Sequence, residues 1–198
     1  MGGRGDGKGI PHRYIQRCSV KEEIIFAGFG GQGIMLMGKA LAYAAMNNGR
    51  HVTWMPSYGA EVRGGTAHSM VIISDEIIAS PVVKEPTICV VMNRPSLQKF
   101  ETRVKKGGFL IVNKSLIDID AARNDIDILN IPATNMASEL NSLKSANMII
   151  LGALLAKRSI VSLESLIDAL KDALSVSNYN MIPINEKAIR KGFEYGSR

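Results

Sequence analysis

Apolar residues along the first two thirds of the chain occur in short runs, separated by stretches with helical periodicity. From residue 34, apolar positions recur every three or four residues up to Asn47-Asn48-Gly49, which predicts a helix and its stop. Runs that are apolar at almost every position are typical of strands buried on both faces of a parallel sheet. The pattern predicts strands at residues 24–27, 51–55, 67–74, 87–92, 109–112 and 126–131.

The last third of the chain, after Pro132, has helical periodicity. Helices are predicted at residues 134–143, 146–156, 163–174 and 185–195, the last one capped by Asn185. The second is apolar almost all round and should be buried, and Gly152 would let it approach a neighbour closely. Strands that alternate with helices and then give way to helices predict an α/β fold, a three-layer Rossmann-like domain with a mainly parallel sheet and a helical C-terminal third.

Two further elements complete the predicted fold. Arg94-Pro95 opens a helix at about residues 96–104, because proline suits the first turn of a helix. Residues 76–80 could pair back with residues 67–74 through a turn at Ser74-Asp75. The sheet is therefore expected to have an antiparallel edge.

The net charge of +6 is concentrated at the amino-terminal end of the chain. Residues 1–21 contain five basic residues and a single acidic one: Arg4, Lys8, Arg13, Arg17, Lys21 and Asp6. The rest of the chain therefore has an ordinary surface charge. We expect residues 1–21 to be a flexible basic tail, disordered or an arm, and residues 22–198 to be a single domain. Because the folded part lacks basic strands interleaved with aromatic residues, we expect no nucleic-acid partner.

The composition predicts a soluble, cytoplasmic protein. No apolar run reaches the roughly 18 residues needed to cross a bilayer, and the amino terminus lacks the apolar stretch of a signal peptide. Cys18 and Cys89 are the only cysteines, too few for a disulfide framework or a four-cysteine metal site. We expect no membrane attachment and no metal site, and an iron–sulfur cluster would need cysteines from another chain.

A glycine motif, Gly28-Phe29-Gly30-Gly31-Gln32-Gly33, lies between the first predicted strand and the first predicted helix. Such a turn brings backbone N–H groups close to an anion at the start of the helix. A dinucleotide site also needs a carboxylate at the end of the second strand, and residues 51–57 supply none. Three interpretations stay open: NAD or FAD binding, contact with another anion such as a coenzyme A phosphate, or glycines that only permit tight packing.

A second motif follows the second predicted strand: Pro56-Ser57-Tyr58-Gly59-Ala60-Glu61-Val62-Arg63-Gly64-Gly65-Thr66-Ala67. Together, the two motifs at this spacing resemble the gamma subunit, or the fused gamma domain, of 2-oxoacid:ferredoxin oxidoreductases. The resemblance extends over roughly residues 22–195 and includes a last helix that begins near Asn185. The second motif looks closer to the 2-oxoglutarate and branched-chain 2-oxoacid enzymes than to the pyruvate or indolepyruvate enzymes.

The resemblance implies a reaction in which a 2-oxoacid, coenzyme A and oxidised ferredoxin give an acyl-CoA, carbon dioxide and reduced ferredoxin. It implies that alpha and beta subunits hold thiamine diphosphate with Mg²⁺, that iron–sulfur clusters carry the electrons, and that a ferredoxin-like delta subunit can join the complex. This chain would be an accessory subunit, inactive alone and without a cofactor of its own, that contributes to the coenzyme A site. The candidate contact residues are Gly28, Gly30, Gly31, Gln32, Gly33, Ser57, Tyr58, Arg63, Gly64, Gly65 and Thr66.

Several polar side chains in or near the two motifs have simpler structural explanations. Arg63 can reach a phosphate with bidentate geometry or brace Glu61 within its loop. Tyr58 suits interface packing better than proton donation, and His68 has no partner visible in the sequence, which favours a structural role. We assign no catalytic residue to this chain.

Two other functions stay open. A self-sufficient NAD(P)-dependent dehydrogenase would use the glycine motif, although the missing carboxylate argues against it. A stand-alone Rossmann-like nucleotide-binding module would use the same fold without joining a complex. An isolated gamma-type subunit would expose the apolar surface that its partners cover, so we expect the free chain to form a homodimer or to aggregate.

Overall fold

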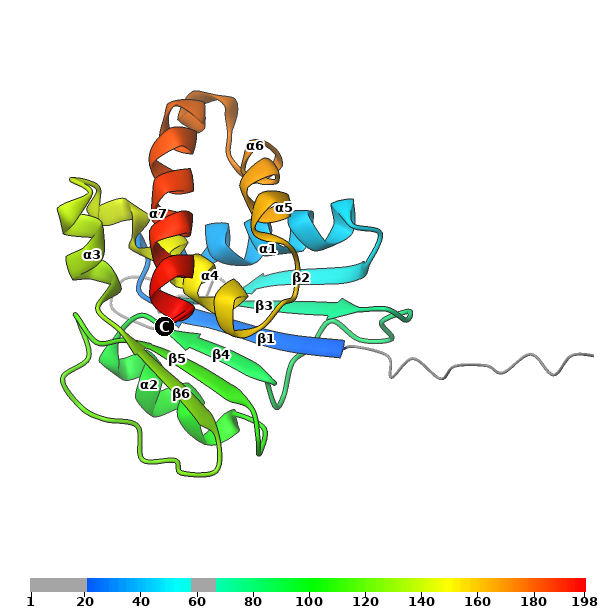
Figure 1. The fold of residues 1–198 in the computed structure, drawn as a ribbon. Coiled ribbons are helices and arrows are strands. Elements are labelled where there is room, and N and C mark those ends of the chain that lie inside the picture. Colours follow the sequence, from blue (N-terminus) through cyan, green and yellow to red (C-terminus); the bar gives the residue numbers. More distant parts are fainter. Residues whose placement is uncertain (1–20, 58–66) are drawn as a thin grey trace, which may run out of the picture.

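A computed structural model describes residues 21–57 and 67–198, and Figure 1 shows its fold. Six strands form one sheet in the order β2-β3-β1-β4-β5-β6. The strands are β1 (Lys21–Gly28), β2 (His51–Ser57), β3 (Ala67–Ser74), β4 (Ile88–Val91), β5 (Phe109–Asn113) and β6 (Asp127–Ile131). The six strands predicted from apolar runs are all present, with ends that differ by a few residues.

The sheet is parallel except around β3. Strands β1, β4, β5 and β6 are parallel neighbours, whereas β3 is antiparallel to both β1 and β2. The mainly parallel sheet with an antiparallel part at one side is confirmed, but the predicted pairing was wrong, since residues 76–80 form no strand. Because β3 lies between β1 and β2, both of its hydrogen-bonding edges are already occupied.

Helices cover both faces of the sheet, which confirms the three layers (Figure 1). One face packs against α1 and α3 to α7, and the other packs against α2, the 3₁₀ turn η2 and the loop that follows β5. The helices are α1 (Ile34–Asn47), α2 (Arg94–Phe100), α3 (Ala133–Glu139), α4 (Ala146–Lys157), α5 (Leu163–Asp168), α6 (Leu170–Ala173) and α7 (Ile182–Gly196). The 3₁₀ turns are η2 (Glu101–Arg103), η3 (Leu143–Ser145) and η4 (Val176–Met181). None of the helices in the described part of the chain is long and apolar enough to span a bilayer.

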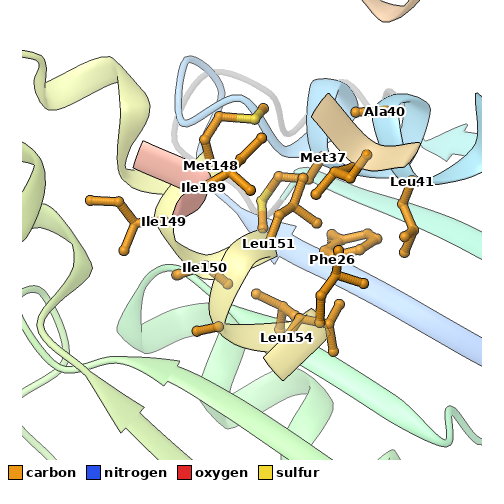
Figure 2. Close-up of a cluster of buried hydrophobic side chains, with 14 of the residues drawn as sticks. Phe26, Met37, Ala40, Leu41, Met148, Ile149, Ile150, Leu151, Leu154 and Ile189 are labelled. Atoms are coloured by element: carbon orange, nitrogen blue, oxygen red, sulfur yellow. The ribbon is translucent and has the colours of Figure 1, made fainter. Parts of the chain in front are cut away.

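Helix α4 is the centre of the larger core, as Figure 2 shows. Its residues Met148, Leu151 and Leu154 are fully buried beside Phe26 of β1 and Met37 of α1. The opposite side of α4 packs against α7, which explains why the helix is apolar all round and confirms its predicted burial.

The last two predicted helices differ from those in the structure. The pattern at residues 163–174 forms two helices, α5 and α6, with Ala169 between them. The last helix begins at Ile182 instead of residue 185, because Pro183 suits its first turn. Asn185 is therefore not a cap: it lies inside α7, is buried, and accepts a hydrogen bond from Ser145 Oγ at 3.2 Å.

Candidate functional site

The glycine motif forms the turn between the end of β1 and the start of α1. Gln32 folds its side chain back into this turn: Phe29 N donates to Gln32 Oε1 at 2.6 Å, and Gln32 Nε2 donates to the Met92 carbonyl at 3.3 Å. Asn93 Nδ2 also reaches Gln32 Oε1, at 3.4 Å. Gln32 thus joins the turn after β1 to the segment after β4, and its amide is used inside the protein.

Two of the glycines are required by close packing. A Cβ atom on Gly28 would lie 2.5 Å from Gln32 Oε1 and 2.9 Å from Met92 Cβ. Gly33 has a φ of +73°, and a Cβ atom there would lie 2.1 Å from Asn147 Nδ2, which donates to the Gly33 carbonyl. Packing therefore explains these two glycines, whereas Gly30 and Gly31 are exposed and accessible to a ligand.

A pocket of about 240 Å³ opens beside this turn, where β1, β4, β5 and β6 end. This is the edge at which open parallel sheets bind ligands. The pocket is lined by Gly31, Gln32, Met92, Leu116, Thr134, Leu143, Lys144 and Ala146. Lys144 is the one ionisable side chain in that lining, so the pocket combines a single positive charge with a largely apolar wall.

Thr134 supplies a hydroxyl group to the lining of the pocket. Asn113 Nδ2 at the end of β5 donates to Thr134 Oγ1 at 2.9 Å, which leaves the hydroxyl hydrogen of Thr134 to donate elsewhere. Asn113 is fully buried, and its Oδ1 atom has no hydrogen-bond partner within the described structure. A hydroxyl donor and an ammonium group therefore line one pocket, as oxygen-rich anions require.

Two apolar side chains of the pocket lining are exposed, as is Phe29 in the neighbouring glycine turn. Phe29 is 40% exposed, Leu116 is 48% exposed and Leu143 is 63% exposed. Exposed apolar side chains that gather around a pocket are typical of a surface that another molecule covers. A second pocket of similar size, about 260 Å³, lies on the outer side of α1 and β2 around Tyr43, Met46 and Trp54, away from the glycine turn.

Only part of the second motif falls within the described residues. Ser57 ends β2 and is paired with His68 of β3, while Ala67 at the start of β3 is paired with Gly28. Ser57 and Ala67, the described residues on either side of positions 58–66, therefore lie at the end of the sheet where the glycine turn begins. Tyr58, Arg63, Gly64, Gly65 and Thr66 themselves lie outside the described residues, so their predicted role stays a prediction.

The strand order bears on the dinucleotide interpretation. In a dinucleotide-binding sheet, the carboxylate that holds the ribose follows the strand next to β1. Here β3 separates β2 from β1, which places Ser57 roughly 10 Å from β1 at the usual spacing of strands. Within the described residues, the site therefore has neither the carboxylate nor the strand arrangement of a dinucleotide fingerprint.

His68 and Cys89 lie on the face of the sheet that packs against α2. Burial lowers the pKa of His68, with smaller effects of Lys99 and Arg103, and His68 Nδ1 has no hydrogen-bond partner among the described residues. Burial raises the pKa of the Cys89 thiol to about 12, so it stays protonated at neutral pH. Within residues 21–57 and 67–198, no group of three or more His, Cys, Asp or Glu side chains could hold a metal ion.

The sequence pattern missed the residues that complete the pocket. Leu116 comes from the turn after β5, Thr134 from the first turn of α3, and Leu143 and Lys144 from η3, all more than 80 positions from the glycine motif. A signal was available for Thr134, which follows a predicted strand at the ligand-binding edge of the sheet. Asn147 near the start of α4 donates through Nδ2 to the Gly33 carbonyl at 3.3 Å.

Comparison with known proteins identifies a family with which this chain shares its sequence and fold. Residues 23–195 match the family model described as pyruvate ferredoxin/flavodoxin oxidoreductase. Ketoisovalerate oxidoreductase subunit VorA of Methanothermobacter marburgensis is 37% identical over 87% of this chain, and the chain spans only 36% of that protein's length. The 2-oxoglutarate synthase subunit KorC of Methanocaldococcus jannaschii is also 37% identical, over 90% of this chain and 96% of its own.

Solved structures show the same fold. The gamma subunit of a keto/oxoacid ferredoxin oxidoreductase from Geobacter sulfurreducens has a TM-score of 0.76 and 29% identity, over 88% of this chain and 98% of its own. The 2-oxoglutarate:ferredoxin oxidoreductase from Magnetococcus marinus, with 2-oxoglutarate, coenzyme A and succinyl-CoA bound, has a TM-score of 0.79 and 25% identity, over 89% of this chain and 31% of that chain.

Proposed function

Because this chain belongs to the pyruvate ferredoxin/flavodoxin oxidoreductase family, we propose that it is the gamma subunit of a 2-oxoacid:ferredoxin oxidoreductase complex. The complex would convert a 2-oxoacid, coenzyme A and oxidised ferredoxin into an acyl-CoA, carbon dioxide and reduced ferredoxin. The relatives named for ketoisovalerate and for 2-oxoglutarate support a branched-chain 2-oxoacid or 2-oxoglutarate as substrate. The near full-length match to a solved gamma subunit supports the accessory role.

One observation of the site carries the proposal: the pocket beside the glycine turn has one cation, one hydroxyl donor and an apolar wall, with no acid–base pair in its lining. Among the described residues, such a lining offers groups that bind a ligand but no paired general acid and base. The phosphates of coenzyme A would lie at Gly30, Gly31 and Lys144, and its uncharged arm along Leu116 and Leu143. The chain's own contribution is binding and orientation of this substrate.

Thiamine diphosphate, Mg²⁺ and iron–sulfur clusters would be held by the alpha, beta and delta subunits. The described residues do not fit a cluster, because Cys89 is fully buried as a protonated thiol and no metal-binding group surrounds it. Phe29, exposed in the glycine turn beside this pocket, is the side chain that we assign to contact with the neighbouring subunits. A reducing, cytoplasmic location agrees with a free buried thiol.

The first experiment is purification of the native complex through an affinity tag on this chain, followed by identification of its partners and an absorption spectrum. We expect partners with a brown iron–sulfur spectrum and coenzyme A-dependent reduction of ferredoxin by a 2-oxoacid. A panel of 2-oxoacids then identifies the substrate. A chain that purifies alone and without colour would contradict the proposal and favour the stand-alone binding module.

The coenzyme A contact is tested in the same complex with Lys144→Ala. Loss of one partly exposed charged contact, about 1 kcal/mol, should raise the KM for coenzyme A about fivefold and leave the KM for the 2-oxoacid unchanged. Lys171→Ala, an exposed lysine on α6, is the matched control. An unchanged KM for coenzyme A in Lys144→Ala would remove this pocket from the coenzyme A site without affecting the subunit assignment.

A further inference from the structure

A basic pocket lies at the opposite end of the sheet, where β1, β4 and β5 begin (the right-hand end of β1 in Figure 1). Its volume is about 250 Å³. It is lined by Lys21, Glu22, Thr87, Lys105, Lys106, Gly107, Gly108 and Arg158. Strand β1 has eight residues, so this pocket and the glycine turn are roughly 25 Å apart along the sheet.

The cations of this pocket are only partly neutralised. Lys21 pairs with Glu23 at 2.6 Å, and Arg158 contacts Asp127 at 3.4 Å. Glu22, the one acid in the lining, already accepts a hydrogen bond from the Thr87 hydroxyl at 2.5 Å. Among the described residues, no carboxylate lies within salt-bridge distance of Lys105 or Lys106.

The backbone that carries these two lysines is held in place. Lys105 N donates to the Pro86 carbonyl at 2.9 Å, and Gly107 N donates to the Asp125 carbonyl at 2.9 Å. Gly108 N donates to the Lys105 carbonyl at 2.8 Å, and a Cβ atom on Gly108 would lie 2.7 Å from that same oxygen. The turn is therefore built closely against its neighbours, whereas both lysine side chains project into solvent.

The chemistry of the pocket selects among anionic partners. The N–H groups of Gly107 and Gly108 are already donated to carbonyl groups, so they cannot form the backbone cradle typical of phosphate sites. None of the lining residues is aromatic, which removes the stacking surface used by single-stranded nucleic acids. Glu22 inside the pocket and Asp127 beside it would repel a continuous phosphate backbone.

We propose that this pocket docks an acidic surface of a partner protein through Lys105 and Lys106. Exposed lysines suit carboxylates on a protein surface, and such charge pairs mainly accelerate and orient association. Residues 1–20, which precede Lys21 in the sequence, contain four basic residues and one acidic residue: Arg4, Lys8, Arg13, Arg17 and Asp6. Their net charge is therefore positive, like that of the pocket lining. Because the two sites lie at opposite ends of the sheet, this partner could bind while the glycine-turn pocket is occupied.

The test uses the full chain and fluorescently labelled poly-L-glutamate as a carboxylate-bearing probe. Lys105→Glu combined with Lys106→Glu should weaken binding about tenfold and reduce its dependence on salt concentration, since four units of charge change at the pocket. The control is Lys171→Glu combined with Lys187→Glu, an equal change of charge at exposed positions on α6 and α7. Thermal unfolding of all variants checks that the fold is retained.

The outcomes separate a docking site from general attraction to positive charge. A tenfold loss confined to the Lys105 and Lys106 variant, with amide NMR shifts at residues 21–22 and 105–108 of the parent chain, supports the proposal. Equal losses in the two double variants would overturn it. Displacement of the probe from this pocket by inorganic phosphate or by DNA at lower concentrations than by unlabelled poly-L-glutamate would also overturn it, because the pocket would then prefer phosphate.

Discussion

Replacing Gly152 by alanine should destabilise the protein, although alanine is the better helix former. A Cβ atom at residue 152 would lie 1.9 Å from the Ile189 carbonyl oxygen and 2.8 Å from Phe193 N. The contact is reciprocal, because a Cβ atom on Gly192 would lie 1.8 Å from the Ile149 carbonyl oxygen. The backbones of helices α4 and α7 are thus in direct contact, and no change of a side-chain rotamer could make room for an added Cβ atom.

The expected magnitude follows from two opposing effects. Carbon needs about 3.5 Å from such a neighbour, so the helices would have to separate by more than about 1 Å. Overpacking of this kind costs about 3 kcal/mol at a contact that cannot repack, whereas the change from glycine to alanine within a helix contributes about 1 kcal/mol of stability. The net loss is about 2 kcal/mol, which lowers the Tm of a protein of this size by roughly 4 to 8 °C.

Urea denaturation followed by the fluorescence of Trp54, the single tryptophan, measures this change, and calorimetry gives the Tm. Lys187→Ala, an exposed substitution on the same α7, is the control and should change stability by less than about 0.5 kcal/mol. If Gly152→Ala leaves stability unchanged or increases it by about 1 kcal/mol, helix propensity dominates and the close helix contact is refuted.

Two further predictions concern the glycine turn and the other face of the sheet. Gln32→Ala removes the hydrogen-bond partners of Phe29 N and the Met92 carbonyl, so it should lower the free energy of unfolding by about 1 to 2 kcal/mol. The control Gln98→Ala, at an exposed position, should leave the free energy of unfolding unchanged. Equal urea midpoints for the two variants would contradict the role of Gln32. Because the pKa of His68 is lowered by burial, its contribution to stability is complete above the unfolded pKa of about 6.5 and is lost as pH falls through the folded pKa. Stability should therefore fall more steeply below about pH 6.5 in the parent protein than in His68→Phe, and parallel denaturation curves across pH would argue against a buried neutral imidazole.

Much of the fold follows from local patterns that the sequence displays directly. The six strands and the buried helix α4 were predicted because apolar spacing reports which faces of an element are covered. The glycine motif predicted a turn between a strand and a helix, and the turn lies there. Gly28 and Gly33 are needed in it because a side chain would not fit at either position. These features depend on neighbours in the chain or on how deeply each element is buried.

The tertiary structure alone decided which elements became neighbours. The place of β3 between β1 and β2 could not be predicted from spacing, because a strand with an apolar pattern can pair on either edge and only competition among all strands settles the order. The same holds for the pocket, where Lys144 and Thr134 meet Gly31 across more than 100 residues. Gln32 likewise looked available to a ligand in the sequence, but Met92 and Asn93 engage its amide once β4 lies beside β1. Local propensity thus determined the elements of this protein, and long-range pairing determined its candidate site.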